Sequence, residues 1–381
     1  MRRCVEILGT WIGGLAWACI LAAPLAAWGD ELPADGLPTV DAAPADTYPS
    51  MSGELWIEIQ NDRMYHAQDR DRELNDLYAT IEPAISFAFT ESFSIESALV
   101  FEPVEDPDPH ESREFSQQGL FVEEIYALWT SGNLSLRAGK INPRFGKAWD
   151  LAPGLYGVDF AEDYELTERV GAGASYDLGN ADTGSHVLSF ETFFADTSHL
   201  TRSVFRGRSR VRRDDGGPSN TGRLNSYSVT LEGEAIPAIE GLTYNLGLVY
   251  QADGGDGRPE SDYVAGATYA FSVTDTLDLE FLAEYVLQDN ADGEADRARR
   301  YLTGSAAALY NDLTVALSYT LRDESIRAAR DNNDFLFQVS VGYFREVGIG
   351  QAGFEAGYRL TREENQKVGT AGLRASYLVP F

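Results

Sequence analysis

One segment of the sequence, residues 142–168, combines charged and apolar side chains in a pattern that could attract ions. Its charged residues are two basic side chains followed by six acidic ones: Arg144, Lys147, Asp150, Asp159, Glu162, Asp163, Glu165 and Glu168. Carboxylates at a narrow aqueous passage attract cations, because their field is focused over a short distance. Apolar residues such as Phe145, Trp149 and Phe160 favour a packed segment. The alternative is an ordinary surface loop with solvated charges.

The four histidines offer no arrangement suited to catalysis. His66, His110 and His199 fall in expected loops, and His186 lies at the start of an expected strand. A hydrolase would need a histidine held beside an ordered nucleophile and an acid, and Ser198 next to His199 is adjacency in sequence alone. The chain also has no metal-ligand spacing, phosphate loop or nucleotide fingerprint. We therefore expect no enzyme, no cofactor and no metal ion.

The elements that would position the charged residues are β-strands. Most of the chain repeats about ten residues of alternating character followed by a turn. In residues 277–287 the odd positions are apolar, as at Phe281 and Tyr285, whereas Glu280 and Glu284 occupy even positions. Because side chains i and i+2 share a face of a strand, one face of this segment is apolar and the other meets water.

The same alternation predicts sixteen strands. They cover residues 53–60, 77–90, 92–102, 119–130, 133–141, 169–178, 185–195, 223–235, 241–251, 262–273, 276–288, 300–310, 312–322, 334–345, 348–360 and 367–381. Between them, short turns such as Ser131-Gly132 alternate with long polar connections. The long ones are 61–76, 103–118, 142–168, 196–222, 252–260, 289–299, 323–332 and 361–366. Short turns on one rim and long loops on the other are typical of membrane-spanning barrels.

We therefore predict an all-β fold, an antiparallel transmembrane β-barrel of about 16 strands. A closed sheet pairs every backbone group that lies in the bilayer, and this many strands leave an aqueous lumen. The mean hydropathy of −0.26 excludes a helical membrane protein, because such a protein would be strongly apolar. A soluble β-sandwich is the alternative, but the strands of a sandwich rarely have lengths as uniform as those of the sixteen predicted strands.

The N-terminus has the order of a secretory signal. Arg2 and Arg3 precede a mostly apolar run, and small residues lead to a cleavage site at Ala27-Trp28-Gly29. We predict a signal peptide at 1–29, a disordered lead-in at 30–50 and the barrel at 51–381. A membrane-anchor helix is the alternative. Both cysteines lie in the signal, so the mature chain would form no disulfide.

The C-terminal strand carries the first resemblance to a known class. Leu373, Ala375, Tyr377, Val379 and Phe381 share one face, so that the chain ends in mid-strand on an aromatic residue. An export signal with such an end resembles Gram-negative outer-membrane β-barrels. The resemblance implies that Phe381 is the signal read by the barrel-assembly machinery, and that the protein resides in the outer membrane beside its lipid and lipopolysaccharide.

A second resemblance is to sixteen-stranded porins. In the general trimeric porins, the loop after the fifth strand folds into the lumen, and residues 142–168 occupy that place. Residues 136–146 also resemble the strand-then-Pro-x-Phe-Gly stretch of the phosphate-selective O/P type. The resemblance implies a homotrimer and passive diffusion of ions and small hydrophilic solutes, with the third loop as the constriction.

The parity of the strands places more acidic than basic side chains in the lumen. The predicted lumen-facing charges are Glu82, Glu96, Arg137, Glu232, Glu280, Glu284, Arg322, Glu355, Arg359 and Arg374. This surplus predicts a cation preference, and the sequence suggests no arginine ladder along the lumen. A channel specific for anions, phosphate or another substrate, and an adhesive barrel with a blocked lumen, are the alternatives.

A basic run in the fourth long connection is the exception to this acidic balance. Residues 202–213 contain six arginines. They could bind lipopolysaccharide phosphates, collect anionic solutes at the pore mouth, or be a solvated loop. A net charge of −30 argues against nucleic acid as a partner.

Overall fold

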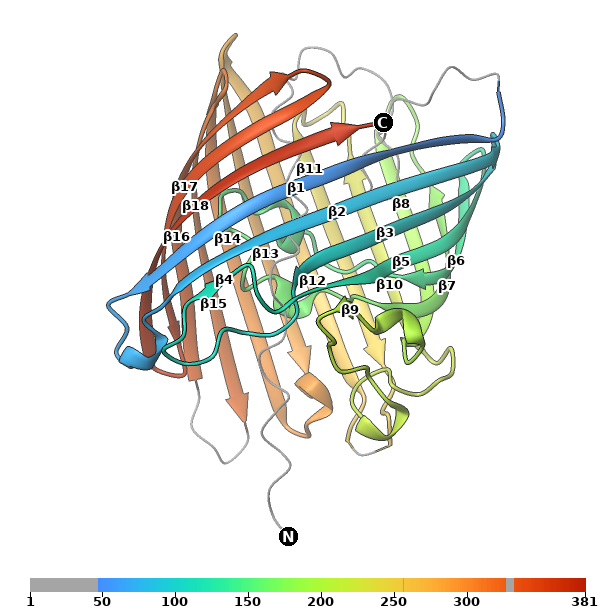
Figure 1. Ribbon diagram of the computed structural model, residues 1–381. Coiled ribbons are helices and arrows are strands. Elements are labelled where there is room, and N and C mark those ends of the chain that lie inside the picture. The colour runs from blue at the N-terminus through green and yellow to red at the C-terminus, as the bar shows by residue number, and fades with distance from the viewer. Residues whose placement is uncertain (1–46, 256, 327–331) are drawn as a thin grey trace.

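The computed structural model describes residues 47–255, 257–326 and 332–381. In this part of the chain, sixteen long strands form one antiparallel sheet that closes into a barrel (Figure 1). Their bounds are β1 (Ser50–Tyr65), β2 (Asn75–Thr90), β3 (Phe93–Pro103), β5 (Gln118–Ser131), β6 (Leu134–Ile141), β7 (Arg169–Asp177), β8 (Ser185–Ala195), β10 (Ser226–Glu234), β11 (Leu242–Gln251), β12 (Glu260–Thr274), β13 (Leu277–Asp289), β14 (Arg297–Tyr310), β15 (Leu313–Ile326), β16 (Asn332–Val347), β17 (Gly350–Glu363) and β18 (Gln366–Pro380).

The predicted fold is therefore confirmed, and each of the sixteen predicted strands has a counterpart. The largest difference is at β1, which was predicted to end at residue 60 and continues to Tyr65. Asn61, Asp62 and Arg63 suggested a loop. They stay in the sheet because β1 pairs with β18 on one side and with β2 on the other as far as Arg63.

The remaining elements are short and lie in the connections. Two strands of two residues, β4 (Arg113–Glu114) and β9 (Val204–Phe205), were not predicted. The one α-helical turn among the described residues is α1 (Ala148–Leu151), and 3₁₀ turns occupy Arg70–Arg72, Glu162–Tyr164, His199–Thr201, Arg213–Asp215 and Ala291–Gly293. No helix in the described ranges is long and apolar enough to cross a membrane.

The two faces of the strands divide as the alternation predicted. On β13, Phe281 and Tyr285 are exposed on the outer surface, whereas Leu282 and Glu284 are buried inside the barrel. Figure 1 shows the end of β18 at the rim with short turns, and the long connections at the opposite rim. Gly132 and Asn311 take positive φ angles in two of these short turns, a conformation that Gly and Asn adopt readily.

The last residue helps to close the ring. β1 and β18 pair antiparallel from Glu54↔Pro380 to Tyr65↔Gly369. Beyond that ladder, Phe381 N–H donates to the Gly53 carbonyl and Gly53 N–H donates to the Phe381 carbonyl, both at 2.8 Å. Closure thus includes the C-terminal aromatic residue itself.

The closure makes Gly53 a sensitive position. A Cβ at residue 53 would lie 2.4 Å from the Ala84 carbonyl oxygen and 2.7 Å from the Phe381 ring. We expect Gly53→Ala to destabilise the barrel by about 1 to 3 kcal/mol, because the backbone at the seam must shift. Thermal unfolding of the protein in detergent, followed by circular dichroism, measures the effect.

Gly304→Ala is the matched control. Gly304 lies in β14, and a Cβ there would meet no atom within 4 Å. This variant is expected to unfold at or above the wild-type temperature, since alanine is favoured over glycine in a strand. Equal unfolding temperatures for the two variants would show that the contact between Gly53 and Phe381 does not matter for closure.

Candidate functional site

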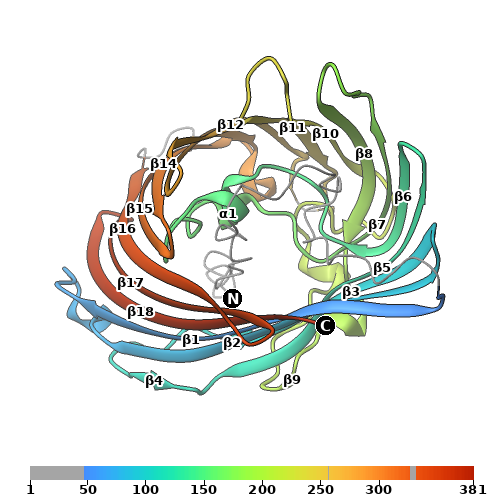
Figure 2. The same cartoon turned by 90° about the horizontal axis from the view of Figure 1, so that it is seen from above.

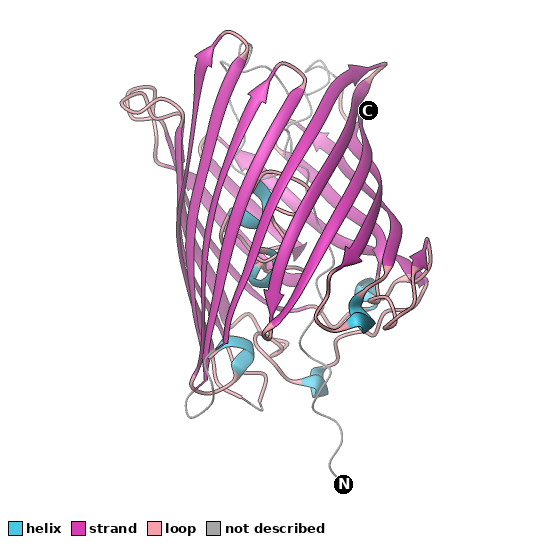
Figure 3. Cartoon of the chain, turned by 90° about the vertical axis from the view of Figure 1, so that its left-hand side faces the viewer, coloured by secondary structure: helices cyan, strands magenta, loops and turns pink. Residues whose placement is uncertain are grey.

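The connection between β6 and β7, residues 142–168, is the candidate site. It belongs to no long strand, and Figure 2 shows its helix α1 inside the ring of strands. Figure 3 shows short helical segments at mid-height of the barrel as well as at the long-loop rim. The contacts of this segment with inward-facing side chains explain its position.

Apolar packing holds the segment against one side of the wall. Phe145, Ala148, Ala161, Tyr164 and Leu166 form one buried cluster with side chains from the strands, namely Phe193, Val249, Val264, Leu282, Val286 and Tyr301. The rings of Tyr164 and Tyr301 meet edge to face, with their centroids 5.1 Å apart. Burying several aromatic side chains favours one fixed position for the segment.

Glu284 of β13 anchors the start of α1. Its carboxylate accepts hydrogen bonds from the backbone N–H groups of Lys147 (2.8 Å) and Ala148 (3.0 Å). It also accepts from the Tyr164 hydroxyl (2.7 Å) and from Asn245 Nδ2 (2.8 Å). Glu284 was predicted as a lumen charge. In the structure this side chain is 3% exposed and satisfies donors from both the segment and the wall.

The acidic half of the segment is tied to side chains of β14, β15 and β17. Asp159 pairs with Arg359 of β17, and Asp163 lies 2.7 Å from Arg322 of β15. Tyr301 of β14 also donates to Asp163, at 3.1 Å. The sequence predicted these two aspartates as constriction charges, and the structure brings each to a predicted lumen arginine.

Two hydrogen bonds from uncharged donors complete this attachment. Tyr156 donates its hydroxyl proton to Asp62 of β1 (2.5 Å), and Gln338 of β16 donates to the Pro153 carbonyl (2.9 Å). Sequence reasoning did not identify Asp62 or Gln338. The parity of β1 could have identified Asp62, but no local signal pairs it with a tyrosine that is 94 positions away.

The basic residues at the start of the segment are also paired. Arg144 lies 2.9 Å from Glu191 of β8, which Arg137 of β6 contacts as well. Lys147 lies 3.1 Å from Glu232 of β10. Positive charge at this end of the segment is therefore balanced locally by strand carboxylates.

The predicted carboxylate at the end of the segment lies at the wall. Glu168 accepts hydrogen bonds from Lys140 (2.7 Å) and from Arg208 (2.5 Å). Arg208 belongs to the basic run 202–213, and its guanidinium also lies 3.6 Å from the centre of the Phe121 ring. Thus one arginine of that run reaches the inner side of the barrel at this point.

Four carboxylates at the site have oxygens without a hydrogen-bond partner among the described residues. They are Glu162 and Glu165 of the segment, Glu82 of β2 and Glu123 of β5. Each is at least nine-tenths buried, and neither oxygen of Glu165 has a partner. Glu123 was missed because a β-bulge in β5 turns both Glu123 and Glu124 inward, which a strict alternation does not allow.

The pKa shifts in the segment reflect this crowding. Burial raises the pKa of Glu165 well above its usual range, and the nearby carboxylates Glu123 and Glu162 raise it further. Burial also raises the pKa of Glu162, and the nearby carboxylates Asp159 and Glu102 raise it further. Burial also raises the pKa of Asp150 to about 6, against the effect of Lys147.

Four inward-facing arginines, here called the arginine row, come from strands within the run β14–β18, with none from β16. Arg299, Arg322, Arg359 and Arg374 come from β14, β15, β17 and β18. Arg322, Arg359 and Arg374 were predicted as lumen-facing charges, whereas Arg299 was missed because it precedes the predicted start of its strand at residue 300. Each arginine has a carboxylate partner, which for Arg299 is Glu324 at 2.6 Å and for Arg374 is Glu355.

The other predicted lumen charges lie at the edges of this arrangement. Glu96 accepts from the Ser86 hydroxyl at 2.9 Å, and Glu355 serves as the partner of Arg374. Glu280 is half-buried on the inward face of β13 and makes no ion pair in the part of the chain that is described. These residues do not contact the segment.

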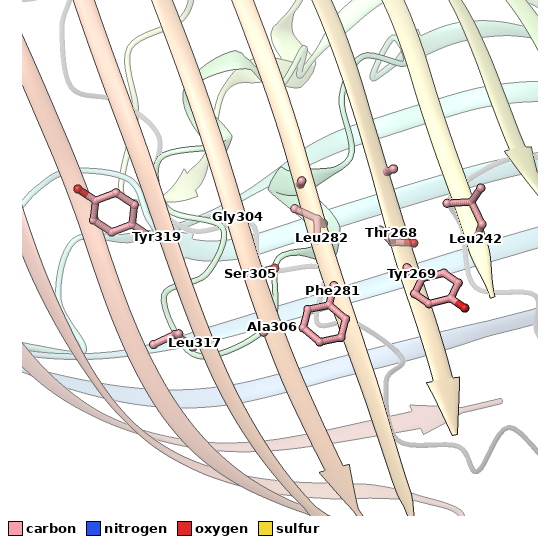
Figure 4. Close-up of a pocket in the computed structure, with 12 residues that line it drawn as sticks. Leu242, Thr268, Tyr269, Phe281, Leu282, Gly304, Ser305, Ala306, Leu317 and Tyr319 are labelled. Carbon is pink, nitrogen blue, oxygen red and sulfur yellow. The ribbon is translucent and has the colours of Figure 1, made fainter. Parts of the chain in front are cut away.

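A hollow of about 470 Å³ lies elsewhere, on the outer face of β11–β15 (Figure 4). Its lining includes the exposed side chains of Tyr269, Phe281, Leu317 and Tyr319, together with Gly304. These residues belong to the apolar outer surface. The hollow is therefore separate from the candidate site.

Comparison with known proteins shows the fold. No protein-family model and no curated protein matches the chain. The outer-membrane channel DcaP of Acinetobacter baumannii is similar at 14% identity and a TM-score of 0.51, covering 86% of this chain and 96% of its own. OccAB3 of the same organism is similar at 11% identity and a TM-score of 0.53, covering 87% of this chain and 99% of its own.

A third similar structure is OpdK of Pseudomonas aeruginosa, solved with vanillate. It shares 10% identity at a TM-score of 0.53, with 87% of this chain and 99% of its own covered. The chain thus has the closed sixteen-strand architecture of known outer-membrane channels. At such identities the similarity concerns the fold alone.

The role of Glu284 can be tested directly. Glu284→Ala removes the acceptor of four hydrogen bonds, and each buried donor left without a partner costs about 1 to 3 kcal/mol. We expect the segment to leave its position, which would make the single-channel current in a planar bilayer larger and noisier. Glu280→Ala, on the same face of the same strand, is the control and should conduct like the wild type. A quiet current of wild-type size from Glu284→Ala would mean that this carboxylate does not hold the segment.

Proposed function

We propose that the protein is an outer-membrane channel through which ions and small hydrophilic solutes diffuse passively. The closed barrel with an apolar outside and a polar inside supports this proposal, because such a sheet can cross a bilayer and enclose water. The similarity to solved outer-membrane channels adds the same support at the level of the fold.

We further propose that residues 142–168 narrow the channel and give it a preference for cations. One observation carries this proposal: Arg322, Arg359 and Arg374 are ion-paired, whereas Glu82, Glu123, Glu162 and Glu165 retain oxygens without partners in the described residues. A paired arginine contributes little net field. At a pH above the raised pKa values of Glu162 and Glu165, the carboxylates without partners therefore dominate the potential that a permeating ion meets.

A substrate-specific channel is the second candidate function. The row of Arg299, Arg322, Arg359 and Arg374 favours it, because a solute carboxylate could exchange with the side-chain carboxylates that now pair with these residues. OpdK, one of the similar structures, was solved with the carboxylate vanillate. An anion preference of the open channel would favour this candidate.

Several expectations remain predictions. The signal peptide at 1–29 lies outside the described residues, and so does most of the lead-in at 30–50. The homotrimer follows only from the sequence resemblance to sixteen-stranded porins, and so does the similarity to the phosphate-selective type. The recognition of Phe381 by the assembly machinery follows only from the resemblance to outer-membrane barrels. Residence in the outer membrane, with lipid and lipopolysaccharide around the barrel, is part of the proposal.

Neutralising the carboxylates without partners tests the cation preference. In Glu162→Gln/Glu165→Gln, the permeability ratio of K⁺ to Cl⁻ should fall towards one, because two negative charges leave the narrow part of the lumen. The zero-current potential of purified protein in a planar bilayer under a KCl gradient measures this ratio. Glu111→Gln/Glu114→Gln removes the same charge from exposed positions of a rim connection and is the control.

Two outcomes would contradict the proposal. If both double variants change the ratio equally, residues 142–168 do not act as the filter. If the wild-type channel prefers Cl⁻, the arginine row controls permeation instead.

The preference should also depend on pH. Burial raises the pKa of Asp159 to about 6, although Arg359 acts in the opposite direction. As the pH falls through this value, Asp159 becomes neutral and Arg359 loses this partner. Burial also raises the pKa of Glu162 and of Glu165, so acidification acts on these carboxyls in the same direction. Cation preference should therefore fall on acidification from about pH 8 to about pH 5 and return on reversal. A zero-current potential that stays constant over this range would contradict the assignment.

A further inference from the structure

The barrel wall has a gap beside β5. β6 is only 8 residues long and pairs with β5 from Ile125↔Lys140 to Ser131↔Leu134. Residues 118–124 of β5 therefore extend beyond β6 towards the long-loop rim. A strand edge of this kind exposes backbone groups that must be paired where the wall meets lipid.

The basic run of the fourth long connection covers this edge. We call residues 202–213 the basic flap. Within it, β9 pairs antiparallel with β5, at Gly119↔Phe205 and Leu120↔Val204. Arg206 N–H adds a hydrogen bond of 3.3 Å to the Gln118 carbonyl. The flap thus completes the sheet where β6 is too short.

The flap lies on the outer side of the wall. The ring of Phe205 meets that of Phe101 edge to face, with centroids 6.1 Å apart. Phe101 faces outward, since its neighbours Val100 and Glu102 are buried inside the barrel. Figure 2 shows β9 outside the ring of strands. β9 is consequently beside the barrel and not over its lumen, whereas the side chain of Arg208 reaches inward to Glu168.

Two arginines of the flap form ion pairs that hold it in place, and the other four could bind a ligand. Arg206 pairs with Glu105 on the neighbouring connection, and Arg208 with Glu168. The remaining arginines make no ion pair with any described carboxylate. They are Arg202, Arg210, Arg212 and Arg213, of which all but Arg210 are exposed.

Exposed apolar side chains accompany these arginines. Phe205 is 84% exposed and Val204 is 55% exposed, and Val211 is exposed as well. Arginines beside exposed aromatic and aliphatic groups suit an amphipathic anion whose charge lies next to hydrocarbon. A soluble anion would satisfy the arginines but would leave Phe205 and Val204 in water.

We propose that the basic flap binds the phosphate groups of lipid A in the outer leaflet. Arginine binds phosphate through two parallel hydrogen bonds, and Phe205 and Val204 would contact the acyl chains beside it. The net charge of −30 opposes anionic ligands overall, but the flap concentrates positive charge at one place on the wall. This inference rests on the proposed outer-membrane location and is independent of ion selectivity.

The test compares three proteins in detergent, with binding of fluorescent bisphosphorylated lipid A as the readout. Arg202→Gln/Arg210→Gln/Arg212→Gln should bind about tenfold more weakly than the wild type, since each exposed charge pair contributes little alone. Arg63→Gln/Arg70→Gln/Arg72→Gln removes three exposed arginines, one near the end of β1 and two from the connection after it. This variant is the matched control and is expected to bind like the wild type.

Further measurements separate the possible outcomes. Wild-type protein should bind dephosphorylated lipid A weakly, and inorganic pyrophosphate should compete poorly. Equal binding by both triple variants, no effect of dephosphorylation, or full competition by pyrophosphate would each overturn the proposal. Conductance of the flap variant in a bilayer shows that it is folded. Lipid A binding by a wild-type barrel that does not conduct would refute the channel function and leave the flap site standing.

Discussion

The pairing of every backbone group in a closed ring is the constraint on which the rest of this structure depends. Inside a bilayer an unpaired strand edge is costly, so β1 must join β18, and Phe381 completes the junction with Gly53. A ring of sixteen strands is too wide for its own side chains to fill. Residues 142–168 occupy part of this interior. The same constraint explains the basic flap, which pairs the edge of β5 that the short β6 leaves open.

Inside the ring, charge and packing act together. Glu284 and the apolar cluster around Tyr164 hold the segment against β13, and Asp159 and Asp163 attach it to β17 and β15 through Arg359 and Arg322. These contacts pair Arg322 and Arg359 with carboxylates of the segment. What remains is negative, and this imbalance follows from the acidic surplus of the chain and not from any single residue.

The fold could be predicted because a strand has a period of two, which survives in sequence wherever one face meets lipid and the other meets water. Near the rims this signal fades, which explains the missed end of β1 and the missed Arg299. The residues of the site were predictable as inward charges, as with Glu284 and Arg359. Their partners were not, because the Asp62–Tyr156 contact depends on the path of a connection across the lumen. β9 could not be predicted for a similar reason, because its pairing with β5 depends on the short length of β6.

The most direct test of the account is the conductance of a barrel in which residues 148–164 are replaced by a short Gly-Ser linker. The account predicts a conductance several times that of the wild type, because the segment and not the ring of strands would limit the passage. It also predicts a loss of cation preference in the same variant. A folded barrel with wild-type conductance after this replacement would contradict the account, since the narrowest part of the channel would then lie elsewhere.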